Sequence, residues 1–177
     1  MIDENTDINQ SGDWLAETAK AWEEGHHRIK NLGIKTIIIR IGLVLSRQGG
    51  AMKEIIQTAP FGFLGYFGDG QQKWSWIHID DVASIFLHAV ANKGMEGVYL
   101  ATAPFPVSNK RITTEISKTY SPNRVVAPVP EIILSLMLGE MHTMLMQSCN
   151  CYPERLVESG YQFRFLRIEK AVEDLMK

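Results

Sequence analysis

The sequence lacks a cluster of positive charge, and it lacks a long, uninterrupted apolar run. Its 18 Lys and Arg residues are nearly balanced by 20 Asp and Glu residues, and the basic side chains are scattered along the 177 residues. A nucleic-acid-binding protein would instead present a clustered basic face. The densest apolar segment, residues 132–146, contains Ser135, Gly139, Glu140 and His142 and is not expected to span a membrane. We therefore expect neither nucleic acid nor a membrane among the partners.

Cysteine is also scarce, because Cys149 and Cys151 are the only two in the chain. Two thiols do not make a zinc site by themselves, and a spacing of one residue is unfavourable for a mutual disulfide. We interpret them as reduced thiols of a cytoplasmic protein, with zinc or redox chemistry as less favoured alternatives. The acidic and polar start, residues 1–7, is unlike a secretory signal or a transit peptide.

The apolar periodicity predicts an α/β protein with an irregular α+β second half. Residues 14–32 predict a helix, and the almost wholly apolar residues 35–45 predict a strand covered on both faces, as in a parallel sheet. The glycine- and aromatic-rich residues 60–73 are expected to form a loop. Extended segments are expected at residues 74–79, 97–101, 125–129 and 161–165, and helices at 51–58, 81–91, 109–119, 131–147, 153–160 and 168–176.

The strand at residues 74–79 carries candidate ligand-binding side chains. Alternate side chains of a strand share a face, so Trp74, Trp76 and His78 are expected to point the same way. Two indoles and an imidazole next to loop 62–72 predict one shared cavity in which a ligand ring is stacked and hydrogen-bonded. The alternative is that both tryptophans belong to the core and that His78 has a structural partner. The acidic pair at residues 80–81 is interpreted as a helix cap rather than as catalytic acids.

Arg40 is a second candidate, because it lies inside the apolar strand. A buried arginine needs a partner of opposite charge. We favour a carboxylate of the same fold as that partner, and a ligand phosphate is the alternative.

Three motifs follow one another along the chain: RIGLVLS with a following GG at residues 40–50, GQ with WSWIHIDD at residues 70–81, and PERL with GYQF at residues 153–163. In this order they resemble the epimerase-like branch of the short-chain dehydrogenase/reductase superfamily, of the NAD-dependent epimerase/dehydratase type. Members of this branch are described as nucleoside-diphosphate-sugar epimerases or cell-division-inhibitor-like proteins. They carry a C-terminal domain of unknown function, which the sequence from residue 128 onwards resembles.

The resemblance implies the C-terminal part of a Rossmann-type, doubly wound parallel sheet together with a small α+β substrate lobe. Residues 1–48 and 92–103 would be the remnant of the NAD(P)-binding domain. Residues 49–91 and 104–177 would be the substrate-binding lobe with its C-terminal extension. The strands at residues 36–45 and 97–101 would then be the last two parallel strands of the sheet.

The resemblance also implies the binding residues. The segment of Arg40, Gly42, Leu43 and Val44 would lie near the nicotinamide of NAD or NADP. The substrate would be bound around Gln72, Trp74, Trp76 and His78.

This chain departs from the family pattern in two places. It contains no glycine-rich strand-to-helix turn, which would hold a pyrophosphate at a helix N-terminus, and Met1 resembles a point more than halfway along such a protein. In the superfamily, a Tyr donates or accepts a proton, and a Lys four residues later lowers the pKa of that Tyr. In this chain, the corresponding positions are Trp14 and Thr18. We therefore expect only the C-terminal portion of such a protein, with weak or absent binding of NAD or NADP and with unknown catalytic residues.

The sequence is compatible with two functions. The first is the substrate-side portion of an NAD(P)-dependent sugar-nucleotide epimerase- or reductase-like protein, inactive without its N-terminal dinucleotide-binding half. The second is a non-catalytic binding or regulatory module, or the remnant of a split gene. The expected partners are a small or nucleotide-linked substrate and either that N-terminal half on a separate chain or a second copy. Both protein partners would pair with the edge of strand 36–45, because a long hydrophobic edge promotes association.

Overall fold

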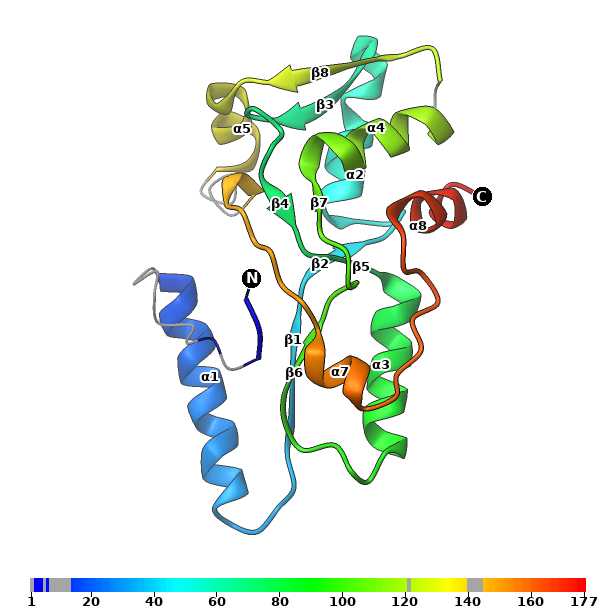
Figure 1. The fold of residues 1–177 in the computed structure, drawn as a ribbon. Helices are drawn as coiled ribbons and strands as arrows, with labels where there is room; N and C mark the ends of the chain where they lie inside the picture. The colour runs from blue at the N-terminus through cyan, green and yellow to red at the C-terminus, as the bar shows by residue number, and fades with distance from the viewer. Residues whose placement is uncertain (1, 5, 7–13, 121, 140–144) are drawn as a thin grey trace.

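A computed structural model describes residues 2–4, 6, 14–120, 122–139 and 145–177 (Figure 1). Parallel strand pairs and helices alternate along most of the chain, as expected for an α/β protein. The elements are α1 (Trp14–Lys30), β1 (Ile37–Ile41), β2 (Leu43–Leu45), α2 (Gly50–Gln57), η2 (Ala59–Phe61), β3 (Phe63–Phe67), β4 (Lys73–Trp74), β5 (Trp76–His78), α3 (Ile79–Ala91), β6 (Gly97–Ala101), β7 (Val107–Ser108), α4 (Asn109–Tyr120), β8 (Val125–Val129), α5 (Glu131–Leu138), α7 (Glu154–Glu158) and α8 (Ile168–Leu175).

One extended segment, residues 37–45, links the two halves of the molecule by changing its partner at Gly42. Before this glycine, β1 pairs in parallel with β6, and after it β2 pairs in parallel with β5. The Gly42 N–H donates to the Ala101 carbonyl, and the Leu43 N–H donates to the Ser75 carbonyl. A Cβ atom at Gly42 would overlap the Ser75 carbonyl oxygen and would lie 2.6 Å from Thr102 Cγ2. The crossing therefore has room only for glycine.

Two hydrophobic clusters lie on either side of this crossing. The upper cluster in Figure 1 joins α2, β3, α4 and α8 around Trp76, Met52 and Ile112. The lower cluster joins α3, β6 and α7 around Ile85 and Leu156. Residues 79–91 thus pack with the β1–β6 pair, although we assigned them to the substrate lobe.

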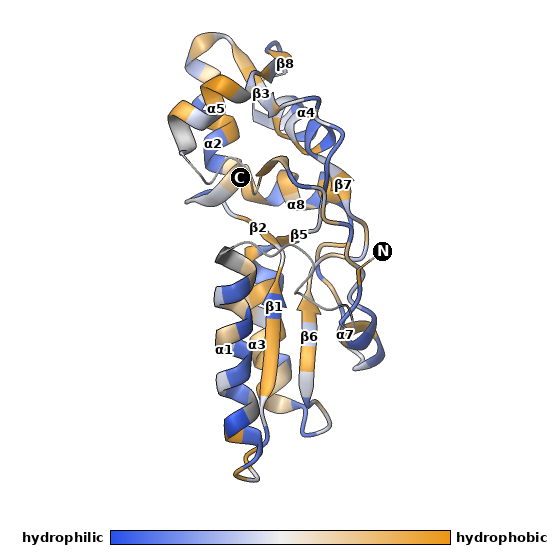
Figure 2. Cartoon of the chain, turned by 90° about the vertical axis from the view of Figure 1, so that its left-hand side faces the viewer, coloured by the Kyte–Doolittle hydropathy of each residue, from blue (hydrophilic) through white to orange (hydrophobic). Residues whose placement is uncertain are grey.

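Helices α1 and α3 lie on opposite faces of the β1–β6 pair (Figure 1). Viewed after a quarter turn, β1 and β6 are mostly hydrophobic, whereas α1 is largely hydrophilic (Figure 2). The side chains of β1 are only half-buried, and that of Ile41 is 45% exposed. The expectation that this strand is buried on both faces is therefore wrong, because no side chain of β1 is fully buried.

Three local expectations are corrected by tertiary contacts. The predicted loop at residues 60–73 contains β3, which pairs in parallel with β8 between two glycines of positive φ, Gly62 and Gly68. The predicted strand at residues 74–79 is interrupted at Ser75, whose side chain bonds to the segment at residues 149–151. The predicted strand at residues 161–165 is irregular instead, because its backbone bonds to a side chain.

That side chain is the buried carboxylate of Asp81 in α3. Its Oδ1 accepts from the Tyr161 hydroxyl and from the Arg164 N–H, both at 2.9 Å, and its Oδ2 accepts from the Phe165 N–H at 3.0 Å. Burial, reinforced by this hydrogen bond, raises the pKa of Tyr161, so the phenol stays a donor. Asp81 therefore fastens the C-terminal segment to α3 and does not cap the helix. The cap is His78, whose Nδ1 accepts from the Asp80 N–H at 3.0 Å.

We predict that Asp81→Ala lowers the free energy of unfolding by about 3 kcal/mol or more, since it leaves buried donors without an acceptor. Urea denaturation followed by circular dichroism measures the change. The neighbouring Asp80→Ala is the control, because its ion pair with Arg164 is exposed. The control should lower the free energy of unfolding by no more than about 1 kcal/mol. Equal losses of stability in the two variants would show that Asp81 does not fasten the C-terminal segment to α3.

Candidate functional site

The parallel strands β1 and β6 both end at the Gly42 crossing. In open parallel sheets, ligands bind in the crevice outside the carboxyl ends of the strands. Here those ends bring together Gly42, Ser75 and Thr102. We therefore take this end of the β1–β6 pair as the candidate site.

The predicted cofactor-binding segment passes directly through this site. Gly42 lies at the crossing, and Leu43 and Val44 continue into β2, where they pack against the upper and the lower cluster respectively. The hydroxyl of Thr102, just after β6, is buried and has no hydrogen-bond partner within the described residues. Sequence reasoning missed Thr102, although its place immediately after a predicted strand was a usable signal.

Arg40 is engaged by the fold itself. Its Nε donates to Glu23 Oε1 at 2.7 Å, and its Nη2 donates to Glu23 Oε2 at 2.8 Å. This two-pronged arrangement uses the planar fork of the guanidinium against a carboxylate of α1. The structural pairing that we favoured is confirmed, and a role of Arg40 in cofactor binding stays a prediction.

The two tryptophans of the predicted substrate site are core residues. Trp76 is fully buried, and its indole N–H donates to the Phe105 carbonyl at 3.0 Å. Trp74 is 4% exposed, packs against Phe67 at a ring-centroid distance of 5.7 Å, and donates to the Leu145 carbonyl at 3.1 Å. Both indole donors are therefore satisfied inside the protein.

His78 is buried beside the upper cluster, to which Phe165 belongs. Its ring stacks on Phe165 with a centroid distance of 3.8 Å. Its Nε2 lies 3.6 Å from Asp174 Oδ2 and makes no hydrogen bond within the described residues. Burial lowers the pKa of His78, and this effect exceeds the opposing influence of Asp80 and Asp174. The ring is therefore neutral near pH 7, and the contact with Asp174 is not an ion pair at that pH.

Gln72 is turned into the protein as well. Its amide nitrogen donates to the Phe67 carbonyl at 3.0 Å and to the Leu145 carbonyl at 3.3 Å, while its Oε1 is buried without a partner in the described part of the chain. Trp74, Trp76 and His78 are thus each buried with a hydrogen-bond or stacking partner of their own. That they line one cavity with loop 62–72 stays a prediction. Their binding of a substrate stays a prediction.

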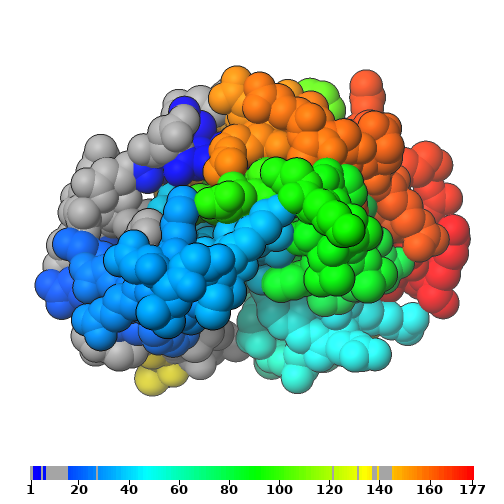
Figure 3. All heavy atoms as spheres, turned by 90° about the horizontal axis from the view of Figure 1, so that it is seen from below, coloured from blue at the N-terminus to red at the C-terminus, as the bar shows by residue number. Residues whose placement is uncertain are grey.

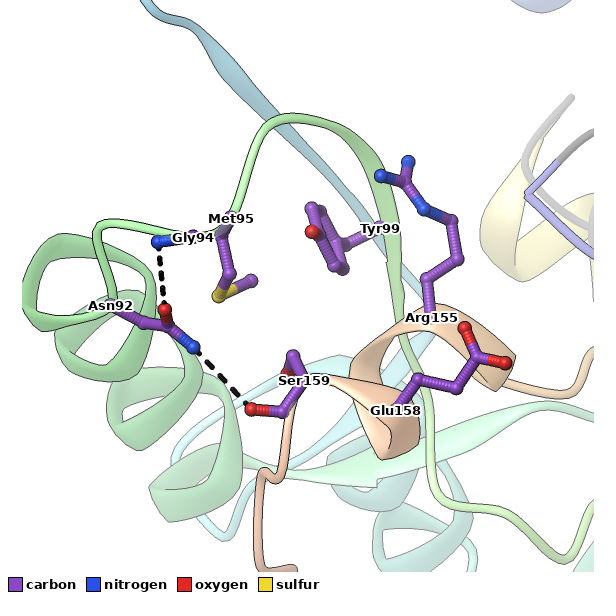
Figure 4. Close-up of a pocket in the computed structure, with 7 residues that line it drawn as sticks. All are labelled: Asn92, Gly94, Met95, Tyr99, Arg155, Glu158 and Ser159. Atoms are coloured by element: carbon purple, nitrogen blue, oxygen red, sulfur yellow. Dashed lines mark hydrogen bonds between the residues drawn. The ribbon is translucent and has the colours of Figure 1, made fainter.

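A pocket lies at the opposite, amino-terminal end of β6 (Figure 4). The Arg155 guanidinium lies over the Tyr99 ring, 4.4 Å from its centroid, and bonds to the carbonyls of Glu96 and Val98. Its donors are thus used to hold β6. The pocket is lined by Asn92, Gly94, Met95, Tyr99, Arg155, Glu158 and Ser159, and it contains no predicted site residue.

The described residues at the candidate site do not fit the pyrophosphate of a dinucleotide. The one cation in β1 is bound to Glu23, and Thr102 offers a single hydroxyl. A pyrophosphate site needs several backbone N–H groups at a helix N-terminus. Within the described ranges, no group of three or more potential metal-ligating side chains occurs, and no helix is long and apolar enough to cross a membrane.

Comparison with known proteins identifies the relationship. Residues 22–100 match the NAD dependent epimerase/dehydratase family. This match agrees with the resemblance inferred from the motifs at residues 40–50 and 70–81. Residues 129–175 match a domain of unknown function, DUF1731, in agreement with the C-terminal domain expected from residue 128 onwards.

Two relatives illustrate the match. An epimerase family protein, YfhF, of Bacillus subtilis is 35% identical over 167 residues, which cover 93% of this chain and 54% of the relative. A chloroplastic epimerase family protein, an SDR39U1 homolog of Arabidopsis thaliana, is 32% identical over 177 residues, which cover 100% of this chain and 50% of the relative. The chain thus spans about half the length of the curated relatives it matches.

Solved structures show the same fold. The human epimerase family protein SDR39U1, determined with NADPH, superposes with a TM-score of 0.86 at 25% identity over 99% of this chain and 59% of that one. A nucleoside-diphosphate sugar epimerase from Corynebacterium glutamicum gives a TM-score of 0.71 at 29% identity over 98% of this chain and 33% of that one. The fold is therefore α/β and Rossmann-like.

We predict that His78 makes the protein less stable as the pH falls below 6.5. Burial holds the folded-state pKa of His78 below the ordinary imidazole value of 6.5, so between these two values the unfolded chain binds a proton that the folded chain does not. The free energy of unfolding should then fall by up to about 1.4 kcal/mol per pH unit from this group. His78→Asn keeps a capping acceptor and removes the titration. The free energy of unfolding is measured by urea denaturation between pH 6.5 and 5. An equal dependence on pH in the wild-type protein and in His78→Asn would contradict this account.

Proposed function

We propose that this chain is the substrate-side portion of an NAD(P)-dependent sugar-nucleotide epimerase- or reductase-like protein, and that it needs a dinucleotide-binding unit to act. The observation that carries the proposal is the edge of β1. Among the described strands, β1 pairs with β6 and with no other. Its bonds to β6 alternate along the strand, so the N–H and C=O groups of Ile37, Ile39 and Ile41 face the other edge.

The two outer edges of the β1–β6 pair differ in a way that supports this proposal. On the far side of β6, the Leu100 N–H donates to Glu4 Oε1 at 3.3 Å, and Arg155 donates to the Val98 carbonyl at 2.5 Å. Side chains thus close that edge. Within the described ranges, no strand pairs with the β1 edge, and we infer that it accepts another parallel strand.

The helices beside β1 carry apolar side chains toward solvent. On α3, Ala83, Phe86, Leu87 and Val90 recur at helical spacing, and the last three are 47%, 72% and 85% exposed. On α1, Trp22 is 72% exposed. The space-filling view from below shows α1, in blue, to the left of the green segment that contains α3 (Figure 3). A strand added to β1 would extend the layer between these helices.

The cofactor part of the proposal draws on the relatives. The human neighbour was determined with NADPH, and this chain covers only part of that protein. We infer that NAD or NADP is held mainly by a unit docked at the β1 edge, with Gly42, Leu43, Val44 and Thr102 lying beneath it. Substrate would bind on the side of Trp74, Trp76 and His78 after a rearrangement of this segment.

A second candidate function, a non-catalytic binding module, is favoured by one sequence feature. The positions that resemble the superfamily's Tyr and Lys are Trp14 and Thr18, which cannot exchange a proton in the same way. Under this alternative, the chain would dock its partner at the β1 edge without supporting hydride chemistry.

The proposal predicts that this chain alone shows no submicromolar, saturable binding of NADPH in a nicotinamide-fluorescence titration. A hybrid in which the chain replaces its matching part of the human relative should bind NADPH, with that relative as the control. The hybrid supplies the N–H groups and helix dipole that hold a pyrophosphate. Tight binding of NADPH by the chain alone would contradict the proposal that another unit holds the cofactor. A folded hybrid that binds no NADPH would contradict it as well.

We also predict that the isolated chain associates through its open edge. Light scattering across a concentration series should give a mass that rises above the 20.0 kDa of one chain. Leu87→Glu in α3 should reduce this rise, because the charge disfavours burial of the exposed stripe. The matched control is Leu136→Glu in α5, which is 88% exposed on the other half of the molecule. A monodisperse monomer at high concentration would show that the edge does not associate.

A further inference from the structure

The two cysteines form a preorganised pair near the Gly42 crossing. The Sγ atoms of Cys149 and Cys151 are 3.2 Å apart, and both thiols are free. Cys149 is exposed, whereas Cys151 is 6% exposed. The sequence spacing suggested a poor disulfide, yet the sulfurs need to approach by only about 1 Å to reach the bonded distance of roughly 2.05 Å.

Ser75 holds the backbone of this pair in place. Its hydroxyl donates to the Cys149 carbonyl at 2.8 Å and accepts from the Cys151 N–H at 2.8 Å. The Cys149 N–H also donates to the Lys73 carbonyl at 2.8 Å. On the other side, the Ile2 N–H donates to the Asn150 carbonyl at 2.8 Å. The segment is therefore fixed between the β4–β5 junction and the N-terminal residues.

The two sulfurs differ in acidity. A hydrogen bond from the Cys151 thiol lowers the pKa of Cys149 to about 6. The same hydrogen bond, followed by burial and by the nearby Glu4 carboxylate, raises the pKa of Cys151. The exposed sulfur is thus the thiolate near pH 7, and the buried sulfur keeps its proton.

We propose that Cys149 and Cys151 form a redox-active dithiol that reacts with low-molecular-weight disulfides and closes to an intrachain disulfide. This site does not depend on the function proposed above. The pair is linked to the Gly42 crossing through Ser75. The hydroxyl of Ser75 holds the cysteine backbone, and its carbonyl accepts from the Leu43 N–H at 2.8 Å.

The reaction consists of two exchange steps, with a disulfide such as oxidised glutathione as the oxidant. The Cys149 thiolate attacks one sulfur of that disulfide, whose S–S bond breaks and releases one glutathione thiolate. Cys151 then loses its proton to the solvent and attacks Cys149 Sγ, which expels the second glutathione thiolate. The protein loses two protons and two electrons, and one oxidised glutathione becomes two reduced ones.

Intact-mass spectrometry of the reduced chain after exposure to oxidised glutathione tests the proposal. The wild-type chain should lose two hydrogen atoms and carry a glutathione adduct only transiently. Cys151→Ser should accumulate one glutathione per chain, because the resolving thiol is absent. Cys149→Ser should react at least about tenfold more slowly, because a buried, protonated thiol is a poor nucleophile. A persistent adduct on the wild-type chain, or equal rates for the two variants, would overturn the proposal.

The role of Ser75 gives a second test. Ser75→Ala should lengthen the lifetime of the mixed disulfide several-fold, because it releases the backbone that holds the sulfurs together. Ser148→Ala is the matched control, since its hydroxyl accepts from the Lys73 N–H and has no described hydrogen bond to either cysteine. In this control, the mixed disulfide should convert to the Cys149–Cys151 disulfide at the wild-type rate.

Alkylation of the wild-type chain by iodoacetamide, followed by peptide mapping, requires no variant to fold. Cys149 should be labelled at least about tenfold faster than Cys151 in the native protein, and the two should become equal in denaturant. Equal labelling in the native protein would refute the asymmetry on which the pair depends.

Discussion

At Gly42 the segment from residue 37 to residue 45 leaves β6 and joins β5, and the space there admits no side chain. The lower cluster, with α3 and α7, packs on the β1–β6 pair, and the upper cluster packs on the β2–β5 pair. Ser75 adds a second link, because its carbonyl holds Leu43 and its hydroxyl holds the cysteine segment. The carboxyl ends of the parallel strands, the candidate site and the dithiol are therefore positioned by one close backbone approach.

The side chains that are most distinctive in the sequence serve mainly to hold this arrangement. Trp74 and Trp76 donate to backbone carbonyls inside the core, and His78 caps α3 while stacking on Phe165. Asp81, next in the same motif, binds the C-terminal segment. The motif by which this segment resembles epimerase-family proteins thus has a structural explanation here, in addition to any contact with substrate.

The β1–β6 pair is stabilised unevenly. Side chains close the outer edge of β6, whereas no described strand pairs with the outer edge of β1, and α1 and α3 carry exposed apolar residues. Unpaired backbone groups and exposed apolar surface both favour association, and this is the physical basis of the proposed docking of another unit at β1. This physical asymmetry agrees with its match to about half the length of its relatives.

The sequence by itself determined the element types that depend on local pattern, such as the helix at α1, the strands at β1 and β6, and the family resemblance. It also predicted a carboxylate partner for Arg40, because a buried cation requires one. Only the tertiary structure decided which partners were used. It turned residues 63–67 into a strand through β8, left residues 161–165 irregular through Asp81, and brought two cysteines of unfavourable spacing to 3.2 Å. These outcomes depend on contacts between residues distant in sequence, which periodicity and local propensity do not encode.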